Sequence, residues 1–201
     1  MRISSTCVLV FLFIVAASET LQAQHLFTTA ETSGFGSPSL LFGFSRTTLN
    51  EGLGEDFTLL TARVSIGIGK TDLFGSFDGV LADDVFDTNF TAWSAGVKHQ
   101  FLRAHLVHIG GIVRIRGNRG TEDRFEDALL DFAGIISIET PHFQPYYALL
   151  YTRPLGFDLS DEFQRTSVFG AEVPIGDIPR VLGEFSFGDR SSFGVALKLQ
   201  F

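Results

Sequence analysis

The feature that most constrains this chain is a period of two in its apolar residues. In residues 60–69, Leu, Ala, Val, Ile and Ile alternate with Thr, Arg, Ser, Gly and Gly. Successive side chains of a β-strand point to opposite faces, so this alternation predicts a strand with one apolar face and one face of small or polar residues. The other segments predicted to be strands are residues 39–45, 73–81, 91–101, 107–116, 130–139, 146–152, 169–173, 180–187 and 193–201.

The connections between these segments alternate in length. The longer ones are polar and occupy residues 47–56, 82–89, 117–126 and 154–165. The shorter ones occupy residues 70–72, 102–104, 140–144 and 176–179. The ninth connection, residues 188–192, is an exception, because it is short where the alternation predicts a long connection. In an up-and-down sheet, alternate connections lie at the same end. Long loops at one end and short turns at the other are typical of outer-membrane barrels.

Charges within the strands fall on the face opposite the apolar one. An Arg or Lys that faces lipid at the middle of a bilayer costs about 2–4 kcal/mol, so this parity predicts an inner surface that carries the charges. The residues predicted to line it, in a structural or a pore role, are Arg63, Lys98, Arg114, Arg116, Asp131, Glu139, Glu172, Arg180, Glu184 and Lys198. Opposite charges on neighbouring strands attract. The expected pairs are Arg114 with Asp131, Glu172 with Arg180, and Glu184 with Lys198.

These patterns predict an all-β fold, a closed antiparallel up-and-down transmembrane β-barrel of about ten strands. Closure pairs the two edge strands, whose free backbone groups would each cost several kcal/mol in hydrocarbon. Eight or twelve strands also fit, because residues 25–33 and 73–81 are irregular. Residues 123–132 fit helical spacing as well, so a short loop helix is an alternative there.

The N-terminus has the pattern of an export signal. Arg2 precedes an apolar run at residues 7–17, which is too short to span a bilayer as a helix and has the length of a signal-peptide core. A small residue, Ala23, ends the predicted cleavage site. The expected organisation is a signal peptide at residues 1–23 and a barrel domain at residues 24–201. Cleavage removes Cys7, the only cysteine, so we expect no disulfide and no thiolate metal site in the mature chain.

The last predicted strand resembles that of the bacterial outer-membrane β-barrel family, whose members end in an aromatic residue preceded by apolar residues at every second position. The matching residues are Phe193, Val195, Leu197, Leu199 and Phe201. The resemblance implies that the outer-membrane assembly machinery reads this strand during insertion. It also implies that the protein, once exported through the inner membrane, lies in the bacterial cell outer membrane in contact with lipid.

Charge and motifs argue against several functions. The formal net charge of −8 disfavours nucleic acid, because binding phosphates needs basic patches. His105 and His108 are three apart on a predicted strand and face opposite sides, so we expect no metal site there and no cofactor. The chain has no G-x-S-x-G motif, and His99 has no serine at an adjacent outward position on the clear strands. A lipid-modifying enzyme is therefore the least favoured role, and we expect the protein not to be an enzyme.

Three roles for the barrel stay open. Inward Ile112, Ile135 and Leu182 favour a lumen filled by side chains and a structural role. A narrow polar passage would instead make the barrel a pore whose charges select small solutes. Aromatic residues in the outer loops would suit a surface-binding or adhesion role; they are Phe86, Phe125 and Phe157. The sequence indicates neither a solute nor an oligomeric state.

Overall fold

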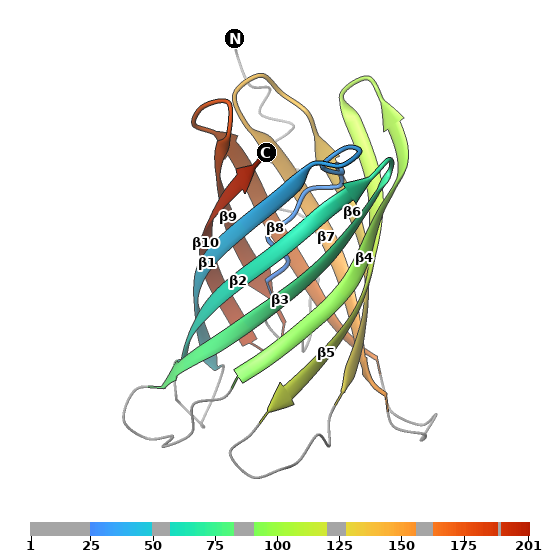
Figure 1. Ribbon diagram of the computed structural model, residues 1–201. Coiled ribbons are helices and arrows are strands. Elements are labelled where there is room, and N and C mark those ends of the chain that lie inside the picture. Colours follow the sequence, from blue (N-terminus) through green and yellow to red (C-terminus); the bar gives the residue numbers. More distant parts are fainter. Residues whose placement is uncertain (1–24, 50–56, 83–90, 120–127, 156–162, 189) are drawn as a thin grey trace, which may run out of the picture.

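The computed structural model describes residues 25–49, 57–82, 91–119, 128–155, 163–188 and 190–201, which form ten strands. The strands are β1 (Pro38–Leu49), β2 (Phe57–Ile68), β3 (Thr71–Ala82), β4 (Thr91–Ala104), β5 (Val107–Arg119), β6 (Leu129–Ile138), β7 (Gln144–Pro154), β8 (Gln164–Pro174), β9 (Pro179–Phe187) and β10 (Arg190–Gln200). Each is antiparallel to its neighbours in sequence, and β1 also pairs with β10, so the sheet closes into a barrel (Figure 1). The predicted all-β up-and-down barrel of about ten strands is confirmed.

Closure leaves every described strand with a partner on both sides. In β1, for example, Phe42 lies opposite Ala62 of β2 and Leu197 of β10. The ladders therefore satisfy the backbone groups along both sides of each strand, and no described strand presents a free edge for pairing with another chain. The register shifts once, between Gln100 and Leu102, where β4 pairs with β5.

Burial alternates along the strands as the period of two predicts. Val64 and Val113 are 60% and 47% exposed on the outer face. Lys98 and Arg114 are each 5% exposed and Asp131 is 0% exposed, all on the inner face. The wall is therefore apolar outside, and these three charged side chains are packed inside.

The two ends of the barrel differ. Short turns at residues 69–70, 105–106, 139–143 and 175–178 lie at one end, together with the start of β1 and the end of β10 (Figure 1, upper end). Gly69 in the first of these turns has φ 65°, a left-handed backbone that glycine adopts without steric cost. The connections at the other end fall largely on residues outside the described ranges. A short helix was the alternative for residues 123–132, and residues 123–127 of that segment also lie outside the described ranges. Leu129–Phe132, the rest of that segment, begins β6.

Residues 25–33, one source of the twelve-strand alternative, form no strand. They run as irregular chain inside the ring of strands, where Figure 1 shows the blue coil. The predicted signal peptide at residues 1–23 lies outside the described residues, so the predicted domain boundary stays a prediction. Among the described residues, no helix is long and apolar enough to cross a membrane.

Candidate functional site

The interior of the barrel is occupied by residues 25–33, which we call the lumen segment. Its contacts reach different walls: His25 contacts β10, Ala30 contacts β6, and Ser33 contacts β3. The chain then leaves over the rim that carries the short turns, where the N–H of Gly36 donates to a backbone oxygen of β2 at 2.8 Å. The lumen segment thus crosses the lumen and continues into β1.

Two apolar clusters hold the lumen segment. Leu26 and Phe27 are 1% and 2% exposed, and burying side chains of this size contributes roughly 1.5–3 kcal/mol each. The left-handed backbone of Phe27, with φ 44°, costs about 1–3 kcal/mol, and the burial of its ring offsets that cost. Leu26 and Ala30 belong to one cluster, whose other buried members are Ile112, Ala133, Ile135, Tyr146, Ala148, Leu150 and Val168. Phe27 belongs to a second cluster, with Leu41, Leu182 and Ala196.

Charged wall side chains bind the backbone of Leu26, which has no strand partner. Its N–H donates to Glu184 Oε2 at 2.8 Å, and its carbonyl oxygen accepts from Arg63 Nη1 at 2.6 Å. Glu184 is 0% exposed and also accepts from the Tyr146 hydroxyl at 2.5 Å. A buried backbone group left unpaired costs about 1–3 kcal/mol. Arg63 and Glu184 therefore satisfy groups of the lumen segment.

Lys98 binds the middle of the lumen segment. Its ammonium donates to Thr28 Oγ1 at 3.1 Å and to the backbone oxygen of Glu31. The carboxylate of Asp72 lies 3.1 Å from the same ammonium and also accepts from the N–H of Ser33 at 2.9 Å. This buried ion pair therefore fixes the segment at two points.

Inward glycines leave the space that the lumen segment fills. A Cβ at Gly194 would lie 2.5 Å from Phe27 Cζ, and one at Gly43 would lie 3.1 Å from Phe27 Cε2. A Cβ at Gly110 would lie 2.9 Å from the backbone oxygen of Ala30. Side chains at these wall positions would collide with the segment, so the small inner residues accommodate it.

A second buried charge cluster lies on β5, β6 and β7, away from the lumen segment. The strand register places Arg114 directly opposite Asp131, and Arg114 Nε donates to Asp131 Oδ2 at 2.8 Å. Arg116 Nε donates to the same oxygen at 2.6 Å, and the Thr152 hydroxyl donates to Asp131 Oδ1 at 2.7 Å. Several donors thus share one carboxylate that is fully buried.

Glu172 is the centre of a third charge cluster. It accepts from Arg180 Nη1 at 2.7 Å, as the sequence leads one to expect, and from Lys198 Nζ at 3.3 Å. The expected pairing of Glu184 with Lys198 is wrong. Glu184 lies opposite Gly194 in the register, not opposite Lys198. Its side chain binds the backbone of Leu26 in the lumen segment.

Glu139, also predicted to line the lumen, lies just beyond the end of β6 at the rim. Its side chain is 41% exposed and lies 3.9 Å from Arg103 Nη2. On its inner side, Glu139 Oε2 lies 3.0 Å from Nε2 of His108, a residue of β5 that is 1% exposed. This end of the lumen therefore carries a histidine and a carboxylate in contact.

Three side chains at the inner end of the lumen segment have the order of a catalytic triad, an arrangement that the sequence did not suggest. His25 Nε2 lies 2.6 Å from Ser192 Oγ, and His25 Nδ1 lies 3.3 Å from Glu184 Oε2. Among the described residues, His25 Nδ1 is buried and has no hydrogen-bond partner. Ser192 is 5% exposed, and the ring of His25 stacks on that of Phe27. The contact of His25 with Ser192 anchors the start of the lumen segment on β10.

The residues of the predicted assembly signal lie on the outer face of β10 and at its end. Phe193, Val195 and Leu197 are 44%, 40% and 40% exposed, and Phe201 is 59% exposed. Leu199 shares their side of the strand and is half-buried. Their recognition by the assembly machinery stays a prediction.

The sequence patterns did not indicate the residues that fill the lumen, above all His25, Leu26 and Phe27. They follow the predicted cleavage site without any periodicity. The signal that could have revealed them is the inner face itself. Its glycines, such as Gly43 and Gly194, carry no side chain where the ring of Phe27 approaches the wall.

No protein-family model matches the chain. A search of curated proteins also found no match. Among solved structures, the chain is similar to the KdgM porin, with 10% identity over 81% of this chain and 99% of that one, at a TM-score of 0.45. A designed transmembrane β-barrel has 10% identity over 85% and 99%, at a TM-score of 0.41. The translocator domain of the autotransporter NalP from Neisseria meningitidis has 10% identity over 84% and 88%, at a TM-score of 0.37.

Proposed function

We propose that the protein is an outer-membrane β-barrel with a structural role, whose lumen is closed at rest by its own lumen segment. The observation that carries this proposal is the burial of Leu26, Phe27 and Ala30, each at most 2% exposed, inside the ring of strands. An open pore needs a continuous polar path for solute and water. Two apolar clusters, which include residues of the lumen segment, occupy the interior here.

The outer surface supports placement in lipid. Exposed apolar patches beyond a few hundred Å² are rare on soluble monomers, and such patches mark contact with a partner or a membrane. On this barrel the large apolar side chains are exposed on strand after strand. They include Phe42, Val64, Ile66, Phe77, Val97, Val113, Ile136, Phe185 and Val195. Lipid contact on all sides explains a band that continues around the closed sheet.

The placement of outward charges supports the same proposal. Along the described strands, outward arginines stand toward strand ends; they are Arg46, Arg153 and Arg165. An Arg near the membrane interface costs about 0–1 kcal/mol, against about 2–4 kcal/mol at the midplane. We infer that the apolar middle of the wall lies in hydrocarbon. Export through the inner membrane then follows from the predicted signal peptide.

A narrow pore that opens when the lumen segment leaves is the second candidate. The observation that favours it is the set of wall charges that contact the segment, Arg63, Lys98 and Glu184. These side chains would line a polar passage in the absence of the segment. An adhesion role would depend on loops outside the described residues and stays a prediction, and we assign the barrel no catalytic role.

Fractionation, gel mobility and conductance of the mature chain test the proposal. We expect the protein in the outer-membrane fraction, with different mobility before and after boiling, because a closed barrel stays folded in the gel detergent until it is heated. We also expect no ion conductance steps in planar bilayers. A soluble periplasmic protein without a mobility shift would contradict the membrane placement. Steady conductance of the unmodified chain would contradict the closed lumen.

A further inference from the structure

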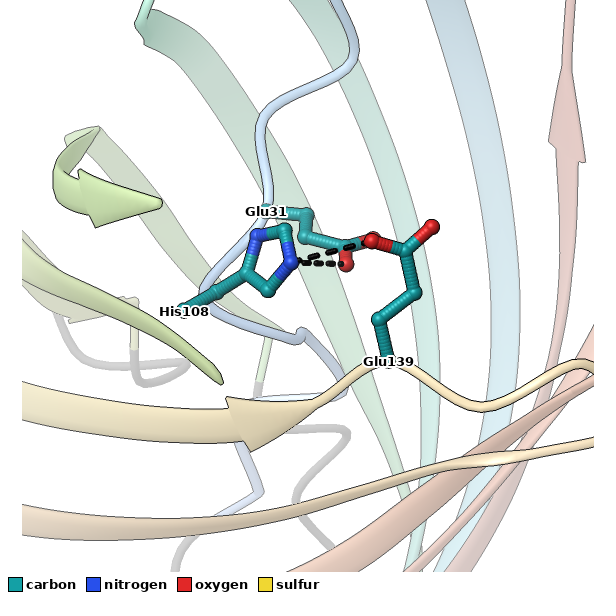
Figure 2. A group of neighbouring side chains, drawn as sticks. All are labelled: Glu31, His108 and Glu139. Carbon is teal, nitrogen blue, oxygen red and sulfur yellow. Dashed lines mark hydrogen bonds and ion pairs between the residues drawn. The ribbon is translucent and has the colours of Figure 1, made fainter. Parts of the chain in front are cut away.

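We propose that Glu31, His108 and Glu139 bind a divalent transition-metal ion such as Zn²⁺, which links the lumen segment to the barrel wall. Glu31 belongs to the lumen segment, His108 to β5, and Glu139 follows β6 (Figure 2). One ligand atom from each residue lies within 4.8 Å of the other two. The three residues come from distant parts of the chain and converge at the rim that carries the short turns.

The two distances from the histidine nitrogen to the carboxylates suit a zinc ion. His108 Nε2 lies 3.0 Å from Glu139 Oε2 and 3.4 Å from Glu31 Oε1. Zinc binds nitrogen and oxygen at about 2.0–2.2 Å in tetrahedral geometry, which sets neighbouring ligand atoms about 3.4 Å apart. A fourth position would be left for water. Imidazole with carboxylates favours zinc or a similar transition metal over the oxygen-seeking Ca²⁺.

An unsatisfied oxygen points to a missing ligand at this place. Glu31 Oε1 is buried and accepts no hydrogen bond from the described residues, because its contact with His108 lacks hydrogen-bond geometry. Burying a carboxylate oxygen without a partner is costly. The Lys98 ammonium binds the backbone oxygen of Glu31, and Arg103 lies 3.9 Å from Glu139 on the exposed side. A divalent cation among the three ligand atoms would complete the site.

The environment of His108 allows its Nε2 to serve as a ligand. His108 Nδ1 lies 2.8 Å from the side-chain amide of the buried Gln100. The oxygen and nitrogen of an amide can exchange places by a half-turn. With the oxygen toward His108, Gln100 accepts the Nδ1 proton and leaves the Nε2 lone pair free. A histidine ligand usually donates its other ring proton in this way, which fixes the orientation of the ring.

Titration of the metal-free mature protein in micelles with Zn²⁺ alone tests the proposal. We expect one ion per chain, an affinity at least tenfold lower for Glu31→Gln and for His108→Gln, and an unchanged affinity for His105→Gln, whose histidine is exposed in the adjacent turn. Zn²⁺ should also raise the unfolding midpoint of the wild type and leave that of Glu31→Gln unchanged. Gel mobility before boiling establishes that each variant is folded.

Three results would overturn the metal site: no Zn²⁺ binding, equal binding by the Glu31 variant, or binding of Ca²⁺ in preference to Zn²⁺. The experiment does not depend on closure of the lumen, because metal binding is measured without any conductance readout.

Discussion

Deleting residues 25–33 is expected to turn a silent barrel into one that conducts ions. Ten strands enclose more space than the eight whose side chains just fill a barrel. Here the extra space holds Leu26, Phe27 and their neighbours. Without them the wall charges face an aqueous passage, so discrete conductance steps should appear in planar bilayers where the full mature chain gives none.

The control for this deletion is a chain of unchanged length. Replacing residues 25–33 by Gly and Ser removes the buried side chains and keeps the connection to β1, so we expect conductance that fluctuates as the loose chain enters and leaves the lumen. Both variants must shift in mobility on boiling, which shows that the barrel is folded. A folded deletion variant that passes no current would mean that the wall side chains close the lumen without the segment.

Asp131→Ala is expected to lower the free energy of unfolding by about 3–5 kcal/mol, the usual cost of removing one partner of a buried ion pair. Arg114, whose side chain is 6% exposed, would lose its carboxylate, and Arg116 and Thr152 would lose the same acceptor. Urea unfolding in micelles measures the change. Asp131→Asn keeps an acceptor for Thr152 and is the milder variant, in case the alanine protein does not fold.

The matched control for Asp131 is Asp177→Ala, which removes an exposed carboxylate from the turn between β8 and β9. We expect it to change stability by no more than about 0.5 kcal/mol. Equal losses at the two positions would contradict the role given to the buried cluster.

The strands were predictable because their signal is local. The outer face of β2 alternates along one short segment, so Val64 and Arg63 are assigned to opposite faces without knowledge of any other strand. Closure followed from the apolar outer face, because an open edge in hydrocarbon is costly. Both inferences need only the period of two and the medium on each side of the wall.

The lumen segment was not predictable in this way, because its structure is set by distant contacts. Leu26 binds Glu184, 158 positions along the chain, and Ala30 binds Ser137, 107 positions along. Irregular chain has no periodicity to read, and its conformation depends on a wall that forms elsewhere. The same reason explains why His108 was not linked to Glu31 and Glu139 beforehand.

Charge pairs were predictable only where the hairpin register was. Arg114 and Asp131 flank one connection and pair directly. Glu184 and Lys198 share the inner face of neighbouring strands, but the register sets Glu184 opposite Gly194. Lys198 then lies four residues further along β10, about 13 Å away at the usual rise of a strand. The alternation of faces tells which side of the wall a residue is on, but not how far along the neighbouring strand its partner lies.

The central claim, that the N-terminal residues occupy the lumen, is tested most directly by a cross-link. The N–H of Ala30 lies 3.3 Å from Ser137 Oγ on the inner face of β6, whereas the adjacent Ile136 is 48% exposed on the outer face. Residues 24–201, the predicted mature chain, contain no cysteine of their own. Mild oxidation of Ala30→Cys with Ser137→Cys should form an intramolecular disulfide, seen as faster migration on a non-reducing gel. Ala30→Cys with Ile136→Cys should not form one. No cross-link at Ser137, or equal cross-linking at Ile136, would contradict a lumen filled by its own chain.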